Sequence, residues 1–172
     1  MQPFYRDFTR AVSYDRLDSY RRGGVPDHVA LGRYLWNMAL SEALYPALHA
    51  VEIALRNNIH HAAQEHYNYN ELWFDTYNLL ETREVQKVVE ARAELQRNHK
   101  PLNGGRNVAE LGFGFWTSLL NSRYEQTLIQ PLLPKLLPHA PATHQDREEL
   151  RRRMEKIRRP RNRAFHHEHI WH

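Results

Sequence analysis

The longest helical pattern in the sequence is YLWNMALSEALYPALHAVEIALRNNIH, residues 34 to 60. In the wider stretch from about residue 30 to residue 67, large apolar side chains recur every three or four positions, the period of an α-helix that buries one face. They are Leu31, Leu35, Met38, Leu44, Leu48, Val51, Leu55 and Ile59. Pro46 stands inside this pattern. Because a proline removes a backbone donor and clashes with the preceding turn, we expect a kink or a break there.

Further helical segments are expected on both sides of this stretch. In the first of them Leu17 and Tyr20 face inward, and Asp27 is placed to cap the long helix that follows. The alternation of polar and apolar residues typical of β-strands is absent at useful length. The sequence therefore predicts an all-α protein, an irregular bundle of four to five main helices. The flanking helices are predicted over residues 13–22, 80–97, 111–137 and 144–159.

Length and composition favour one domain over residues 1–172. A chain of 172 residues with 41% hydrophobic content can bury a single core. It has no cysteine, which excludes disulfides and thiolate metal sites. No apolar run approaches the roughly 20 residues of a membrane span, and the first residues lack the apolar stretch of a signal peptide. We therefore expect a cytoplasmic protein with no membrane partner. The formal net charge of +4 allows a polyanionic partner without requiring one.

The C-terminal sequence RNRAFHHEHIWH, residues 161 to 172, holds a candidate reaction centre. Histidine can move a proton near neutral pH, arginine can hold a phosphate whose charge grows in the transition state, and asparagine supplies an orienting amide. On a straight helix Asn162 and His166 lie one turn apart, but Arg161 and His166 diverge by about 140°. A site therefore needs either a helix that ends or distorts near Pro160, or a second copy of the chain.

The same spacing occurs a second time, at Arg56, Asn57 and His61, so the pattern alone does not identify the site. Glu52, Arg56 and His60 follow at steps of four, which makes either a polar stripe or an ordinary ion pair on one helix face.

Structural readings of these residues remain open as well. Arg161 can extend the apolar stripe of the last helix towards Phe165 and form an ion pair while His166 points to water. The aromatic residues Phe113, Phe115 and Trp116 favour the core over base stacking. The histidines of the tail lack the H-E-x-x-H motif, because Trp171 stands where its second histidine would be, so we expect no metal site. Those histidines are His166, His167, His169 and His172.

Four segments taken together resemble the Abi-like proteins of bacterial abortive-infection systems, within the HEPN superfamily. These segments are SYDRLDSY, YLWNMALSEALYPALHAVEIALRNNIH, ELGFGFWTSLLNSRYE and IRRPRNRAFHHEHIW, in the order of that family. The last segment carries the superfamily signature in Arg161, Asn162 and His166.

The resemblance implies a HEPN domain that cleaves RNA without a metal or other cofactor. It implies a homodimer whose signature residues Arg161, Asn162 and His166 line a cleft between the two copies. Attack by the ribose 2′-hydroxyl would leave a 2′,3′-cyclic phosphate, which explains an RNA substrate. Supporting positions are expected at Glu52, Arg56, Asn57 and His167.

The resemblance further implies a role in abortive infection or toxin-type defence, with an antitoxin protein or a companion RNA as a partner. The alternative is a non-catalytic RNA-binding or antitoxin-like HEPN module, which would keep the fold and the basic surface but not the cleavage.

Overall fold

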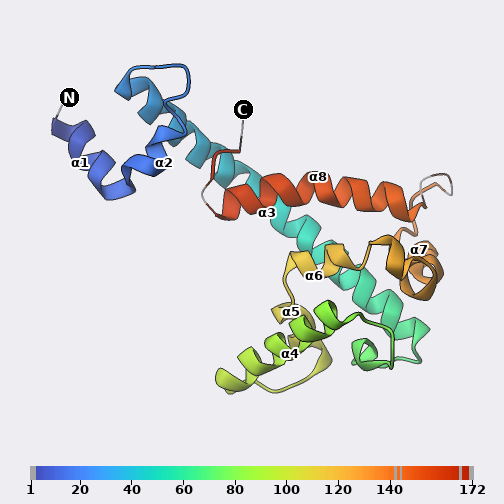
Figure 1. Ribbon diagram of the computed structural model, residues 1–172. Coiled ribbons are helices and arrows are strands. Elements are labelled where there is room, and N and C mark those ends of the chain that lie inside the picture. The colour runs from blue at the N-terminus through green and yellow to red at the C-terminus, as the bar shows by residue number, and fades with distance from the viewer. Residues whose placement is uncertain (1–2, 142, 144, 167, 171–172) are drawn as a thin grey trace. The chain divides into compact units, whose positions relative to one another are not determined.

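The structure, a computed structural model, describes residues 3–141, 143, 145–166 and 168–170. Over these residues the regular structure is entirely helical, without a strand, so the predicted all-α class is confirmed (Figure 1). Within the same residues, no helix combines the length and the apolar character needed to cross a membrane.

Eight α-helices are found in the described part of the chain. They are α1 (Pro3–Val12), α2 (Tyr14–Asp18), α3 (Asp27–His66), α4 (Thr82–Arg97), α5 (Gly104–Glu110), α6 (Phe113–Ser118), α7 (Gln130–Leu136) and α8 (Arg147–Phe165). Two 3-10 turns and one π-helical turn join them: η1 (Trp73–Asp75), η2 (Ser122–Tyr124) and η3 (Glu125–Ile129).

The chain divides into two compact units. The first unit comprises Met1–His49 and Arg159–His172, and the second unit comprises Ala50–Arg158. The boundary between them falls within α3 and again within α8. A single domain over the whole chain stays a prediction.

Three prolines of the described residues lie inside helices: Pro46 in α3, Pro134 in α7 and Pro160 in α8. A break at Pro46 is therefore wrong, a kink there stays a prediction, and α8 does not end at Pro160. A proline costs a helix one hydrogen bond and about 3 kcal/mol. The 40 residues of α3 supply enough other bonds and contacts to keep the helix intact. The carbonyls of Glu42 and Lys156, four residues earlier, lose their usual donor.

The first unit packs α1 and α2 against the early turns of α3. The ring of Tyr34 meets the rings of Phe8 and Tyr20 edge to face, at 5.9 and 5.5 Å between centroids. Ser13 caps α2 by accepting a hydrogen bond from the backbone N–H of Arg16. The helix ends at Asp18, whereas the sequence predicted a helix that continues to residue 22. Helix α1 was not predicted.

The early part of α3 exposes apolar side chains that the sequence pattern assigns to its buried face. Leu35 and Met38 are 49% and 52% exposed, although Leu48, Leu55 and Ile59 are buried as expected. The apolar period is therefore a reliable guide to burial only in the later part of α3, from Leu48 onward.

The core of the second unit is built around two tryptophans. Trp73 and Trp116 are fully buried, and each indole N–H has an acceptor: Nδ1 of His60 at 3.1 Å and the carbonyl of Leu111 at 3.0 Å. Phe113 and Phe115 are buried beside them. The prediction that the aromatic residues of α6 belong to the core is confirmed, and base stacking by them is excluded.

Helix α4 matches the predicted segment closely, but a helix replaces part of the loop expected after it. Helix α5 begins at Gly104, because the side chain of Asn103 accepts a hydrogen bond from the backbone of Arg106 at 2.9 Å. Glu71 packs so tightly here that a Cβ on Gly104 would lie 2.6 Å from the Glu71 Cβ. Glycine is therefore required for this close approach rather than for a flexible loop.

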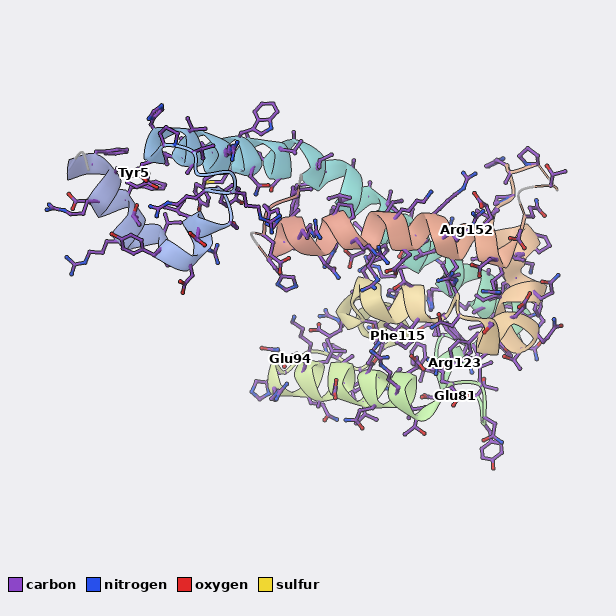
Figure 2. All side chains as sticks on the ribbon, turned by 45° about the horizontal axis from the view of Figure 1, so that its top comes forward. Tyr5, Glu81, Glu94, Phe115, Arg123 and Arg152 are labelled. Carbon is purple, nitrogen blue, oxygen red and sulfur yellow. The ribbon has the colours of Figure 1, made fainter. Side chains whose placement is uncertain are left out.

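A buried carboxylate joins α4 to η2 through Arg123, which Figure 2 labels. Glu84 is fully buried and accepts hydrogen bonds from Arg123 at 2.9 and 3.0 Å and from the Tyr124 hydroxyl at 2.7 Å. The same hydroxyl accepts the backbone N–H of Glu81 at 3.0 Å. Burial, helped by the Glu84 carboxylate, raises the pKa of Tyr124 to about 12.

We expect the stability of the protein to depend on Tyr124 at alkaline pH. The unfolded tyrosine ionises near pH 10, whereas the folded one keeps its proton to about pH 12, so stability falls as the pH rises between these values. Tyr124→Phe should remove this part of the alkaline loss and lower the free energy of unfolding at pH 7 by about 1 to 3 kcal/mol. Urea unfolding at pH 7 and pH 11 measures both effects.

The matched control is Tyr77→Phe, since Tyr77 is 89% exposed. Equal stability of Tyr124→Phe and Tyr77→Phe at pH 7 would contradict the role assigned to the buried hydroxyl.

Candidate functional site

The three signature residues lie at the end of α8, in the first unit. Arg161 and Asn162 are inside the helix, and His166 follows its last residue, with its backbone N–H donated to the carbonyl of Asn162 at 2.9 Å. The His166 side chain is exposed. Helix α8 continues through Pro160, so it does not end there. Because the backbone of His166 keeps the helical hydrogen bond to Asn162, the divergence of about 140° between Arg161 and His166 stays the expectation.

The guanidinium of Arg161 is held by its own helix. It lies 4.1 Å from the centroid of the Phe165 ring and donates a hydrogen bond of 3.3 Å to the side-chain oxygen of Asn162. Phe165 in turn stacks on Tyr45 of α3, with 4.8 Å between centroids and 14° between planes. This contact agrees with the structural reading, in which Arg161 extends the apolar stripe of α8 towards Phe165. A planar cation is thereby fixed at one end of a stack of rings.

The chain beyond His166 is tied down by one buried amide. Asn37 of α3 is 3% exposed, and its side chain both donates to the carbonyl of Glu168 at 3.2 Å and accepts from the backbone N–H of Ile170 at 2.8 Å. The backbone N–H of Glu168 is also bonded to the carbonyl of Arg163, at 2.8 Å. His166 thus stands between two fixed points of the backbone. We call this arrangement the Asn37 clamp.

Sequence reasoning missed Asn37 and Tyr45 as site residues. Both contact residues more than a hundred positions away, and no local pattern marks such a pairing. The sequence signal for Asn37 is its place as a single polar residue in the run YLWNMAL, because an asparagine buried in such a run needs partners for its amide.

The supporting residues proposed from the sequence belong to the second unit. Arg56 donates to the side-chain oxygen of Asn57 at 3.4 Å, the same neighbour contact as in the C-terminal set, and Glu52 lies one turn earlier in α3. That this set shares a cleft with Arg161 stays a prediction. His167 lies outside the described residues.

His60 does not extend the polar stripe that the spacing suggested. It is buried and accepts the indole N–H of Trp73, and burial together with the adjacent His61 lowers its pKa. A neutral imidazole that acts as an acceptor in the core has a structural role. His61 is exposed.

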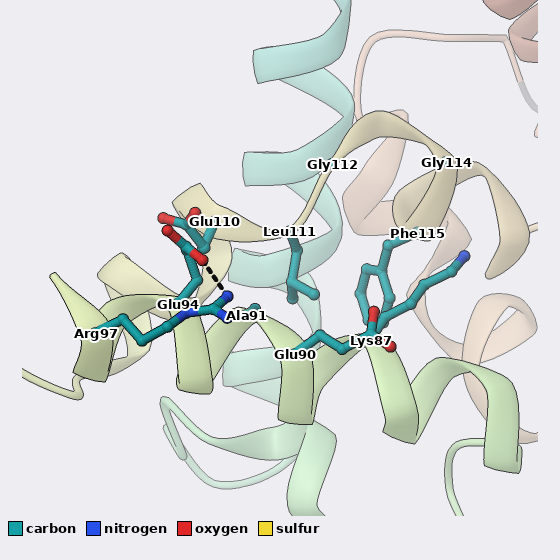
Figure 3. A pocket seen from close by; sticks show the side chains of 10 residues that line it. All are labelled: Lys87, Glu90, Ala91, Glu94, Arg97, Glu110, Leu111, Gly112, Gly114 and Phe115. Carbon is teal, nitrogen blue, oxygen red and sulfur yellow. Dashed lines mark hydrogen bonds and ion pairs between the residues drawn. The ribbon is translucent and has the colours of Figure 1, made fainter.

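A hollow lies in the second unit, between α4 and the connection from α5 to α6 (Figure 3). Lys87 and Phe115 line one end, and Arg97 pairs with Glu94 at the other. Partial burial, with the nearby charge of Arg83, lowers the pKa of Lys87. Because acidic and basic side chains here already neutralise one another, this hollow is a weaker candidate for an anionic ligand.

No described group of three or more histidine, aspartate or glutamate side chains is arranged to hold a metal ion. Comparisons with protein-family models, with curated proteins and with solved structures give no significant match to the chain. The candidate site at the end of α8 is thus defined by its own residues and geometry.

We expect the Asn37 clamp to control the order of the tail. Asn37→Ala removes both side-chain hydrogen bonds, so the amide hydrogen of Ile170 should exchange with solvent about tenfold faster or more. Asn58→Ala is the matched control, since Asn58 donates one side-chain hydrogen bond to the carbonyl of Leu136 in the second unit. Hydrogen exchange measured by NMR compares the two variants, and unchanged exchange at Ile170 in Asn37→Ala would exclude the clamp.

Proposed function

We propose that the protein is a metal-independent endoribonuclease of the HEPN type, acting in abortive-infection or toxin-type defence. The observation that carries the proposal is the end of α8, where Arg161 is braced by Phe165 and Asn162 and an exposed His166 follows on a fixed backbone. The residue types suit phosphoryl transfer, and the resemblance of the surrounding segments to Abi-like proteins supports the same activity.

The proposed reaction is an internal transesterification. The 2′-oxygen of a ribose attacks the adjacent phosphorus, the bond to the 5′-oxygen of the next nucleotide breaks, and a 2′,3′-cyclic phosphate and a 5′-hydroxyl result. His166 takes the proton from the 2′-hydroxyl as the 2′-oxygen attacks, and the resulting imidazolium returns that proton to the leaving 5′-oxygen. Arg161 offers a planar fork of donors to the phosphate oxygens as their charge increases.

The dimer follows from the geometry of the helix. Arg161 and His166 are five positions apart on a regular helix, so their side chains point in directions about 140° apart. A two-fold axis near the end of α8 would bring Arg161 of one copy opposite His166 of the other. The proposed active unit is therefore a symmetric homodimer.

We expect His166→Ala to lose RNA cleavage by a factor of about 10² to 10⁴, the usual contribution of a positioned acid or base, while folding and RNA binding persist. Arg161→Lys should recover only part of the activity lost in Arg161→Ala, because an ammonium does not reproduce the planar fork. The assay follows total RNA incubated with protein in EDTA and maps the ends of the products.

The control for this assay is His61→Ala, which alters the exposed histidine of the second motif. Loss of cleavage in His61→Ala with full activity in His166→Ala would transfer the site to α3. If chelation stops cleavage and zinc or manganese restores it, the metal-independent mechanism is wrong. Binding of RNA without cleavage would favour the non-catalytic module instead.

A mixture of two inactive variants tests the shared site. In a dimer formed by one Arg161→Ala copy and one His166→Ala copy, one of the two composite sites keeps both native residues. Random assortment should then restore about a quarter of the wild-type activity, because half of the dimers are mixed and each has one intact site. A site contained in a single chain would give no recovery after the subunits have been denatured, mixed and refolded together.

A further inference from the structure

The first unit contains a hollow of about 810 Å³, formed by α2, the early part of α3 and the end of α8. Volumes of roughly 300 to 1,000 Å³ are typical of pockets for small organic ligands. Met38, Tyr45, Pro46 and Phe165 supply apolar and aromatic surface to it. Its wall includes Phe165, the ring that braces Arg161.

Planar groups are stacked along one side of this hollow. The Tyr45 ring contacts two rings that are nearly parallel to it. Phe165 lies at 4.8 Å between centroids with 14° between planes, and His49 at 5.9 Å with 17°. The guanidinium of Arg161 continues the series over Phe165. Tyr45 remains 49% exposed, so part of its surface is accessible to a ligand. Flat heteroaromatic rings bind well to such surfaces, and nucleobases are the flat rings that accompany a phosphate.

Glu42 supplies hydrogen-bond acceptors to the polar rim of the hollow. Its side chain supplies a carboxylate, and its backbone carbonyl lacks the usual helical donor because the residue four positions later is Pro46. Arg16 supplies donors on the same rim, whereas the Ser41 hydroxyl already donates to the carbonyl of Asn37 at 2.8 Å. A ligand that presents neighbouring N–H groups beside a carbonyl would match these groups.

We propose that this hollow binds an unpaired nucleobase of single-stranded RNA, with guanine preferred. Guanine offers N1–H and the 2-amino group as donors next to its O6 acceptor, whereas uracil has a single donor between two acceptors. The phosphate attached to the bound nucleotide then extends towards Arg161 at the end of the stack. This inference rests on the proposed ribonuclease function and gives that site a substrate preference.

Binding of defined RNAs to the His166→Ala variant tests the preference without cleavage. The probes are fluorescein-labelled hexauridine and the same hexamer with one guanosine or one inosine in the middle, measured by anisotropy in EDTA. The guanosine hexamer should bind about tenfold more tightly than hexauridine, and the inosine hexamer, which lacks the 2-amino group, should fall between them. Equal affinities for the three RNAs would overturn the proposal.

Two substitutions in the His166→Ala background connect the preference to the hollow. Tyr45→Leu keeps apolar volume but removes the ring, and should weaken binding of the guanosine hexamer about tenfold. Glu42→Gln changes an exposed side chain, so it should leave the fold intact and reduce only the preference for guanosine over uridine. Tyr77→Leu, a tyrosine 89% exposed in the second unit, is the matched control and should have no effect.

The outcomes separate this inference from the proposed activity. Cleavage by the wild type without any base preference, unchanged in Glu42→Gln, sinks the inference and leaves the ribonuclease standing. Selective binding of the guanosine hexamer by a protein that never cleaves RNA supports the base site and rejects the ribonuclease. Free guanosine 5′-monophosphate that binds as tightly as the hexamer would make a free nucleotide the occupant, and the assignment to RNA would be wrong.

Discussion

The geometry of the candidate site depends on one buried amide, that of Asn37. An amide is the only neutral side-chain group that donates and accepts along one edge, so it can satisfy the carbonyl of Glu168 and the N–H of Ile170 together. Aspartate would lose the donor, and leucine would leave both backbone groups without a side-chain partner. The clamp joins α3 to a segment 131 to 133 positions later in the sequence. The segment after His166 is therefore held by a tertiary contact, whereas the backbone of His166 itself is bonded to α8.

Pro46 and Pro160 show how a residue that is unfavourable for its helix can still contribute to the geometry of a site. Each removes a hydrogen bond that its helix would otherwise make, and neither ends the helix. At Pro46 the released carbonyl belongs to Glu42, whose residue borders the hollow of the first unit. In the proposed base site, a residue unfavourable for the helix would thereby add an acceptor for the ligand. Conflicts between local preference and fold are expected to gather at functional positions.

Periodicity was sufficient to predict the class of the fold and several of its parts. The apolar spacing located α4 within two residues at its start, and it identified Leu17 and Tyr20 as buried residues. Such predictions succeed because a helix that packs on one side repeats its apolar residues at a fixed interval. The same reasoning failed for Leu35 and Met38, which have the right spacing but are half exposed. Spacing describes a face of a helix and does not say what covers that face.

The candidate site was predictable only in part. The contact of Arg161 with Phe165 follows from a separation of four residues on one helix. The contributions of Asn37 and Tyr45 come from a distant segment of the chain, and their residue types are common on any helix surface. The cap at Asn103 and the close approach at Gly104 likewise depend on local side-chain and tertiary contacts that a loop-like composition conceals.

The charges of α8 connect the proposed dimerisation with the proposed binding of RNA. Arg151, Arg152, Arg153 and Arg158 form ion pairs with glutamates one turn away in α8, whereas Arg147 pairs with Glu125 and with the adjacent Glu148. From Arg159 onward the helix carries three arginines at its C-terminal end, where the helix dipole favours basic side chains. In the proposed dimer, a phosphate backbone bound near both helix ends would interact favourably with these side chains. RNA that binds the dimer more tightly than the monomer must, by linkage, strengthen dimerisation by the same factor. Assembly of the proposed site and binding of its substrate would then be one coupled equilibrium.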